Sequence, residues 1–238
     1  MKGEILIWKT GEALPPIRAR HGDFEEWIRK GLGGALPVRV RDPRRGEPPR
    51  DPSAFAGLVV TGSPANVTDD APWIFGAAEG LAASVKKGVP VLGICFGHQL
   101  LAAALGGEAG FNPSGRNTGT LLYRPSPAAA EDPLLGALPD PFPAQASHAQ
   151  RVLRLPPGAV LLASAETDPI AAFRIGRRAW GVQFHPEFDA AVTREYVEAY
   201  RKDLAAGGRD PDSLLDSVRE TPEAAAILRR FARLAAGE

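Results

Sequence analysis

The stretch Gly93–Gln99 (Gly-Ile-Cys-Phe-Gly-His-Gln) constrains this chain more than any other part of its sequence. It follows the apolar run Val89–Leu92 and opens an apolar helical segment. A short buried strand that stops at a glycine and turns directly into a helix predicts a sharp elbow that presents a nucleophile. Gly93 and Gly97 suit such a turn, because a Cβ at either place would clash or would need a positive φ. The sequence therefore predicts Cys95 at the tip of an elbow.

Cys95 is the only cysteine of the chain, so it cannot form an internal disulfide. At the elbow its thiol is expected to point into solvent at the positive end of the helix dipole, which favours the thiolate. A lone cysteine is more often a buried structural thiol. The flanking glycines and the strand-to-helix setting favour the nucleophile over that alternative.

Composition excludes several other classes of function. Acidic and basic residues balance at 28 each in 238 residues, so nothing in the charge favours nucleic acid or an anionic membrane as a partner. We expect no transmembrane segment and no signal peptide, since neither pattern is present. A single free cysteine fits the reducing cytoplasm. The sequence shows no cluster of metal ligands and no cofactor motif, so we expect neither a metal nor a cofactor.

Strand and helix patterns alternate in the first half of the chain. We expect strands at Glu4–Trp8, Val38–Val40, Gly57–Val60 and Val89–Leu92, and helices from Asp23 to about Leu32 and from Pro72 to about Lys87. The charged, proline-rich segment Asp42–Pro52 is expected to be a surface loop. This order predicts an α/β fold, with a mostly parallel but mixed, open twisted sheet and helices on both faces.

The pattern changes after Gly107. Short strands separated by turns are expected at Thr118–Tyr123, Phe142–Ser147, Ala159–Ala163, Ile170–Ile175 and Ala179–Phe184. Helices are expected at Asp189–Leu204, from Asp210 onward, and at Pro222–Ala235. We therefore predict a single domain over residues 1–238, with a C-terminal helical extension from about residue 189.

A cysteine nucleophile needs a base, and the base needs a group that orients it. His185 ends an apolar strand, and active groups gather beyond the carboxyl ends of parallel strands. Glu187 lies two residues further on, and an extended segment with Pro186 between would place both side chains on one side. By themselves these residues are equally consistent with an ordinary histidine at the end of a strand.

Thiolate attack on an acyl carbon also requires donors for an oxyanion. The backbone N–H of Phe96, at the start of the helix, is the natural first donor. The turn Gly62-Ser63-Pro64 ends a neighbouring strand at the same sheet edge, so Ser63 is the expected second donor. Taken alone, that segment is more simply a turn.

Two motifs together resemble the class I, or triad, glutamine amidotransferases. They are Gly93–Gln99 and Gln183-Phe184-His185-Pro186-Glu187, in this order and about 90 residues apart, a combination far more specific than either motif alone. The resemblance is strongest to stand-alone proteins similar to the amidotransferase domain of GMP synthase. It runs from about Val59 to Phe188 and implies a flavodoxin-like fold.

The resemblance also implies roles for individual residues. Cys95 would attack the side-chain amide of glutamine, forming a γ-glutamyl thioester and releasing ammonia, with His185 as acid/base and Glu187 orienting it. Other roles are implied for an oxyanion hole (Ser63 and Phe96) and for substrate binding (Gly62, Gln99 and His148). His98 is given no catalytic role, and His21 is expected at the surface.

One position departs from the family pattern. Two residues after His148 the family often carries an acidic side chain, whereas this chain has Gln150, which leaves the substrate open. No phosphate-binding glycine loop of a synthetase is present, so ammonia would pass to a separate synthetase. Hydrolysis of a γ-glutamyl peptide or amine by the same triad is the nearest alternative, and a non-catalytic binding or regulatory subunit is a third.

Overall fold

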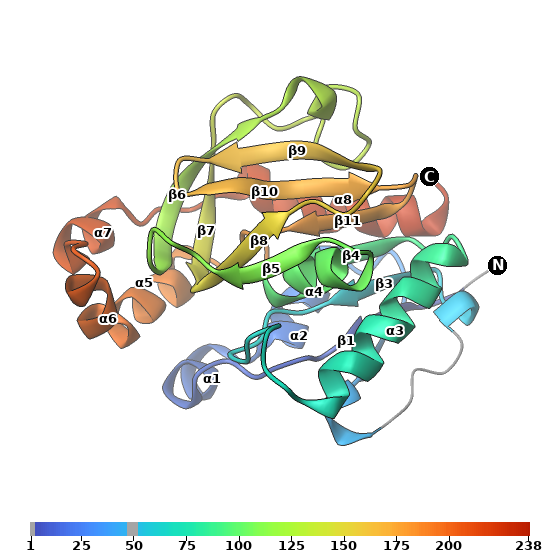
Figure 1. The fold of residues 1–238 in the computed structure, drawn as a ribbon, viewed down its shortest axis with the longest axis horizontal. Coiled ribbons are helices and arrows are strands. Elements are labelled where there is room, and N and C mark those ends of the chain that lie inside the picture. Colours follow the sequence, from blue (N-terminus) through green and yellow to red (C-terminus); the bar gives the residue numbers. More distant parts are fainter. Residues whose placement is uncertain (1–2, 47–51) are drawn as a thin grey trace.

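A nine-stranded mixed sheet forms the centre of the computed structural model, which describes residues 3–46 and 52–238 (Figure 1). The strand order is β2-β1-β3-β4-β11-β10-β9-β6-β7. The sequence predicts a strand at each of these places, and the structure confirms them with small shifts of their ends. The strands are β1 (Ile5–Trp8), β2 (Val38–Arg41), β3 (Gly57–Val60), β4 (Val91–Ile94), β6 (Asn117–Pro125), β7 (Phe142–His148), β9 (Ala159–Ala165), β10 (Asp168–Ile175) and β11 (Ala179–Val182).

The half of the sheet from β2 to β11 is parallel. One face of it packs beneath α2 (Phe24–Leu32) and α8 (Pro222–Ala236), and the other beneath α3 (Pro72–Lys86) and α4 (Phe96–Ala104). Every residue of β1, β3, β4 and β11 is buried, because helices cover both faces. Parallel strands in this position must be apolar along their whole length, which explains their uninterrupted apolar sequences. The expected α/β fold is confirmed.

The other half of the sheet is antiparallel, through β10, β9, β6 and β7. A separate two-stranded sheet pairs β5 (Glu108–Phe111) with β8 (Gln150–Arg154). The sequence predicted neither of these strands nor helix α1 (Pro15–His21). The segment of β5 has no β-branched residue and includes a glycine, and α1 begins with two prolines, so local preferences gave little signal.

The helix expected at Asp189–Leu204 is two helices. α5 (Ala190–Ala199) ends and α6 (Arg201–Ala206) begins at Tyr200, whose backbone has φ −102° and ψ 14°. α7 (Pro211–Ser217) follows, and short 3-10 turns are η1 (Pro43–Arg45), η2 (Pro52–Ala54) and η3 (Pro127–Ala129). Residues 47–51 of the expected loop lie outside the described residues. Within the described ranges, no helix has the length and apolar character needed to cross a bilayer.

Asp23 ties the segment after β1 to the start of α2. Its carboxylate accepts hydrogen bonds from the backbone N–H groups of Ala13 (2.8 Å) and Phe24 (2.9 Å) and from the ammonium of Lys9 (2.8 Å). The Glu26 carboxylate accepts the N–H of Asp23 (2.9 Å), which completes a capping interaction. This buried side chain therefore fixes how the chain enters α2 from the carboxyl end of β1.

We expect Asp23→Ala to lower the free energy of unfolding by about 2–4 kcal/mol, since three donors would lose a buried acceptor and one of them is charged. Chemical denaturation measures this change. Glu4→Ala is the matched control, because the Glu4 ion pair with Arg39 is largely exposed and should contribute less than about 1 kcal/mol. Equal, small effects of both substitutions would contradict the role given to Asp23.

Candidate active site

The elbow between β4 and α4 depends on a very close approach of backbone segments. A Cβ on Gly93 would lie 2.4 Å from the carbonyl oxygen of Gly97, and a Cβ on Gly97 would lie 2.5 Å from that of Val60. Neither glycine has a positive φ, so each is required by space rather than by conformation. The strained residue is Cys95 itself, with φ +51° and ψ −100°, which is unique among the non-glycine residues that the structure describes.

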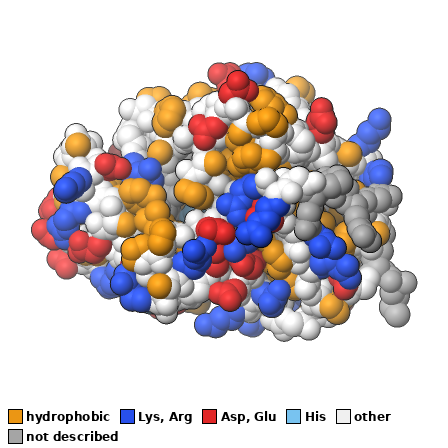
Figure 2. Space-filling view, turned by 90° about the horizontal axis from the view of Figure 1, so that it is seen from below, with side chains coloured by type: hydrophobic (Ala, Val, Ile, Leu, Met, Phe, Trp, Pro, Cys, Tyr) orange, Lys and Arg blue, Asp and Glu red, His pale blue; other side chains and the backbone are white. Residues whose placement is uncertain are grey.

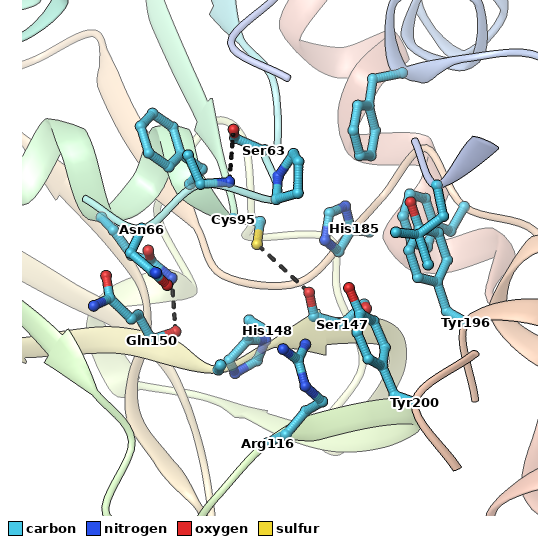
Figure 3. Close-up of a pocket in the computed structure, with 18 of the residues that line it drawn as sticks. Ser63, Asn66, Cys95, Arg116, Ser147, His148, Gln150, His185, Tyr196 and Tyr200 are labelled. Atoms are coloured by element: carbon cyan, nitrogen blue, oxygen red, sulfur yellow. Dashed lines mark hydrogen bonds between the residues drawn. The ribbon is translucent and has the colours of Figure 1, made fainter. Parts of the chain in front are cut away.

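Cys95 is buried, with 5% of its surface exposed, which corrects the expectation that its thiol points into solvent. The residue nevertheless lines a cleft, so it is reachable from outside (Figure 3). Its Sγ lies 3.9 Å from the carbonyl oxygen of Ser147, and the N–H of Cys95 is bonded to the carbonyl oxygen of Val182 (2.9 Å) on β11. The sulfur is thus held at the carboxyl ends of two adjacent parallel strands.

His185 reaches the same cleft from the end of β11. Its backbone N–H donates to the carbonyl oxygen of Gln145 (2.8 Å), and its Nδ1 lies 2.7 Å from Oε1 of Glu187. The two residues are joined by a turn at Pro186–Glu187, with Phe188 N–H bonded to the carbonyl oxygen of His185 (3.4 Å), instead of the extended segment expected. The His185 ring faces Cys95 across the cleft floor in Figure 3.

The surroundings of the His185 ring favour its charged form. Burial disfavours its charged form, but the nearby Glu187 carboxylate and the Cys95 sulfur outweigh this and raise the pKa of His185 from 6.5 to about 10. The Glu187 side chain is itself fully buried, and its Oε2 has no hydrogen-bond partner. The buried carboxylate is therefore compensated chiefly by the imidazolium, as expected of an orienting group.

The cleft encloses about 580 Å³ of empty space, counting the part open to solvent. It is lined by six of the residues singled out in the sequence, namely Ser63, Cys95, Phe96, Gln99, His148 and His185. Glu187 does not line it, because this side chain stands behind the imidazole. Gly62 does not line it either and instead supports the imidazole, since a Cβ there would lie 3.0 Å from Cε1 of His185.

Ser63 and Phe96 follow the carboxyl ends of β3 and β4 and form one rim of the cleft. The hydroxyl of Ser63 donates to the carbonyl oxygen of Thr10 (2.8 Å) and accepts the N–H of Ala65 (3.1 Å), so it holds the loop rather than facing a ligand. Phe96 is the first residue of α4, where backbone N–H groups have no partner within the helix. At both positions the backbone N–H group, and not the side chain, is therefore the candidate donor to an oxyanion.

A chain of amides runs behind this rim. The amide nitrogen of Gln99 donates to the carbonyl oxygen of Gln150 (2.6 Å) and to Oε1 of Gln183 (3.1 Å). The Gln150 side chain accepts the N–H of Val67 (3.1 Å) and donates to the hydroxyl of Thr68 (2.6 Å). Gln150, the residue that departs from the family pattern, therefore holds the loop that follows Ser63 through these two hydrogen bonds. The Gln99 nitrogen is used within the protein, and its expected contact with substrate stays a prediction.

The remaining histidines differ in their surroundings. His148 lines the cleft, and its Nε2 lies 3.2 Å from Asn117 Nδ2 and 3.4 Å from Asp168 Oδ2. His98 is buried away from the cleft, and burial lowers its pKa to about 4. His21 is partly exposed at the surface, as expected, and its Nε2 lies 2.7 Å from Oε1 of Glu195.

The cleft also contains residues that the sequence did not single out. Arg116 lies with its guanidinium carbon 3.8 Å from the ring centroid of Tyr200. Figure 3 shows Tyr200 next to Arg116 and Tyr196 beyond His185. Glu12 lines the cleft but is paired with Arg18 and Arg44. No motif marks these residues, because they come from loops and helices distant from both recognised motifs.

Comparison with known proteins places this cleft in context. A family model described as glutamine amidotransferase class-I matches residues 37–199. The chain is 36% identical over 161 residues to a protein of Ignicoccus hospitalis named as one subunit of a glutamine-hydrolysing GMP synthase, covering 65% of this chain and 81% of that protein. It is 34% identical over 153 residues to gamma-glutamyl peptidase 3 of Arabidopsis thaliana, covering 62% and 61%.

The fold agrees with these matches. A glutamine amidotransferase from Thermotoga maritima superposes over the full length of both chains with a TM-score of 0.78 at 22% identity. Matches to full-length GMP synthases are partial, since this chain spans 24% of the protein from Aeropyrum pernix and 29% of that from a Parafrankia species.

The raised pKa of His185 predicts a specific dependence of stability on pH. Because the pKa is about 10 in the folded chain against 6.5 as the ordinary value, the charged ring contributes stability that is complete below pH 6.5 and is lost as the pH rises towards 10. Over this range, the free energy of unfolding should fall more steeply for the unsubstituted protein than for Glu187→Gln. The substitution removes the carboxylate that contributes most to the raised pKa of His185. Denaturant titrations at a series of pH values measure both slopes. Parallel slopes, or an imidazole that titrates near pH 6.5 by NMR, would contradict the assignment.

Proposed function

The chain belongs to the class I glutamine amidotransferase family, and from that premise we propose that it hydrolyses the γ-amide of glutamine through a thioester on Cys95. The observation that carries the proposal is the convergence of a strained cysteine and a buried His185–Glu187 pair on one cleft (Figure 3). In the proposed reaction the products are glutamate and ammonia, and the only co-reactant is water.

The cleft residues have distinct roles in the proposed hydrolysis. The Cys95 thiolate attacks the γ-carbonyl carbon, and the developing oxyanion accepts hydrogen bonds from the backbone N–H groups of Ser63 and Phe96. The C–N bond breaks as the His185 imidazolium gives its proton to the departing nitrogen. Water then attacks the thioester, His185 takes a proton from it, and the C–S bond breaks to release glutamate.

Glu187 acts on the reaction only through His185. Its bond to Nδ1 fixes the ring orientation and leaves Nε2 directed at the sulfur and the leaving group. Nε2 has no hydrogen-bond partner within the described protein, consistent with a position kept for a reacting proton.

Arg116 is the natural anchor for the substrate carboxylate. It lines the cleft and rests on the ring of Tyr200, and no carboxylate among the described residues forms an ion pair with it. A guanidinium held in this way binds a carboxylate through charge-assisted hydrogen bonds. We assign to it the α-carboxylate of the glutamyl group.

The ammonia would pass to a separate synthetase chain in the cytoplasm. The similarity to a protein named as one subunit of GMP synthase supports a separate partner.

The second candidate is hydrolysis of a substituted γ-glutamyl amide, supported by the similarity to a gamma-glutamyl peptidase. Glutamate release from free glutamine, set against release from γ-glutamyl dipeptides, separates the two. Turnover of dipeptides with none of glutamine would favour the second.

We expect Cys95→Ala to abolish glutamate release, since no other described group in the cleft can form the thioester. Glu187→Gln should lower kcat by about 10²–10⁴-fold and leave measurable activity, because the third member of a triad does not enter the bond changes. A glutamine-like electrophile should label Cys95 at neutral pH. Absence of labelling, or two equally small effects, would instead support a non-catalytic role.

Substitution of Arg116 tests the carboxylate anchor. Arg116→Gln should raise KM about 10–100-fold with a much smaller change in kcat, whereas Arg116→Lys should lie between, since it keeps the charge but loses the planar fork. Steady-state kinetics with glutamine give both constants. A fall confined to kcat would place Arg116 outside substrate binding.

A further inference from the structure

The proposed chemistry divides the cleft into two sides. The γ-carbonyl oxygen must point to the rim formed by Ser63 and Phe96, whereas the departing nitrogen must lie next to His185, which protonates it. Figure 3 shows Ser63 above Cys95 and His185 to one side of it, so the two groups approach the sulfur from different directions. Any group attached to the amide nitrogen therefore extends past His185.

The cleft past His185 has an apolar wall. It consists of Leu14, Phe24, Phe188, Tyr196 and Tyr200, all of which line the cleft. The other side of the cleft is polar, with Ser63, Asn66, His148 and Gln150.

The rings of this wall form one continuous stack that starts at the base. The centroid of Phe188 lies 4.0 Å from that of His185, with 16° between the planes, and Tyr196 stacks on Phe188 at 5.1 Å and 9°. Tyr200 continues the stack at 6.2 Å, and Phe24 lies 6.1 Å from Phe188. The stack leads from the group that protonates the leaving nitrogen to Tyr200 beneath Arg116.

Several parts of the wall come from outside the segment shared with the family. The family model matches residues 37–199, whereas Leu14, Phe24 and Tyr200 lie before or after it. The shared segment contains the nucleophile, the base and both oxyanion donors. Phe188 and Tyr196 lie inside that segment, so Leu14, Phe24 and Tyr200 are the parts of the wall that the family match does not include.

Phe188 supports His185, but ammonia, which is small and polar, gains nothing from the aromatic surface that continues from Phe188 to Tyr200. From this mismatch we infer a further substrate class: γ-glutamyl amides whose nitrogen carries an aromatic or similarly large apolar group, which packs against the wall. The inference rests on the thioester mechanism proposed above. The C–N bond breaks, the proton of His185 goes to the nitrogen, and the substituent leaves as a free amine while glutamate follows by hydrolysis.

The test compares two substrates that differ only in the substituent, the N-benzyl and N-methyl γ-amides of glutamate. We expect kcat/KM for the benzyl amide to exceed that for the methyl amide by at least about tenfold, the effect of burying part of a ring in an apolar pocket. Tyr200→Ser and Leu14→Ser should each reduce this ratio several-fold. Tyr200→Phe is the matched control and should preserve it, because the ring remains. Any effect of Tyr200→Ser on Arg116 acts on the glutamyl part common to both substrates and cancels in the ratio.

The outcomes separate this inference from the proposed function. Hydrolysis of glutamine and of both amides with a ratio near one, unchanged in the variants, would overturn the apolar subsite and leave the thioester mechanism standing. If no substrate releases glutamate, the proposed function fails, and calorimetric binding to Cys95→Ala decides about the subsite. Tighter binding of the benzyl amide by about tenfold would support it, and equal binding of both amides would overturn it.

Discussion

Everything at the site depends on how closely α4 approaches the strands beside it. The backbone at Gly93 and Gly97 leaves no room for a Cβ, so the first turn of α4 lies directly against β3 and β4. Cys95 has to make the turn between strand and helix within one residue and does so at a positive φ. That strain costs on the order of 1–3 kcal/mol and is tolerated because the buried parallel strands on either side fix the backbone. The thiol is thereby held in one place instead of sampling rotamers on a flexible loop.

The parallel half of the sheet places the other groups around this point. β3 leads into Gly62 and Ser63, β4 into Cys95, and β11 into His185, all at the same edge. The carboxyl ends of adjacent parallel strands are the usual place for a site in such a sheet. The antiparallel half contributes differently, because Ser147 and His148 at the end of β7 form the opposite side of the cleft.

Figure 2 shows the molecule from below, where blue and red side chains lie side by side, as expected of a chain whose charges balance.

The sequence was sufficient to predict those parts of the structure that depend on local spacing. Gly93, Cys95 and Gly97 specify their own turn, and the uninterrupted apolar runs identify the buried strands. It was insufficient where the outcome depends on tertiary contact. The turn at Pro186–Glu187 could not be distinguished from an extended segment, and the burial of Cys95 depends on the β7–β8 region that closes over it. Arg116 and Tyr200 meet only because a loop and the break between α5 and α6 are brought together in the folded chain, a contact that leaves no periodic pattern.

Phe188 connects the proposed base to the apolar wall of the cleft. One face of its ring packs on His185 at 4.0 Å, and the same ring supports Tyr196, the next member of the wall. An imidazole that must stay oriented while its charge changes benefits from a rigid, apolar neighbour, since water on that face would screen its interaction with Glu187. The packing that keeps His185 dry thus also builds an aromatic surface beside the leaving group. The two properties are coupled by geometry: a substitution that opened the wall for a polar leaving group would also hydrate the proposed base. This coupling gives a physical reason why the stack begins at the imidazole and extends outward from it.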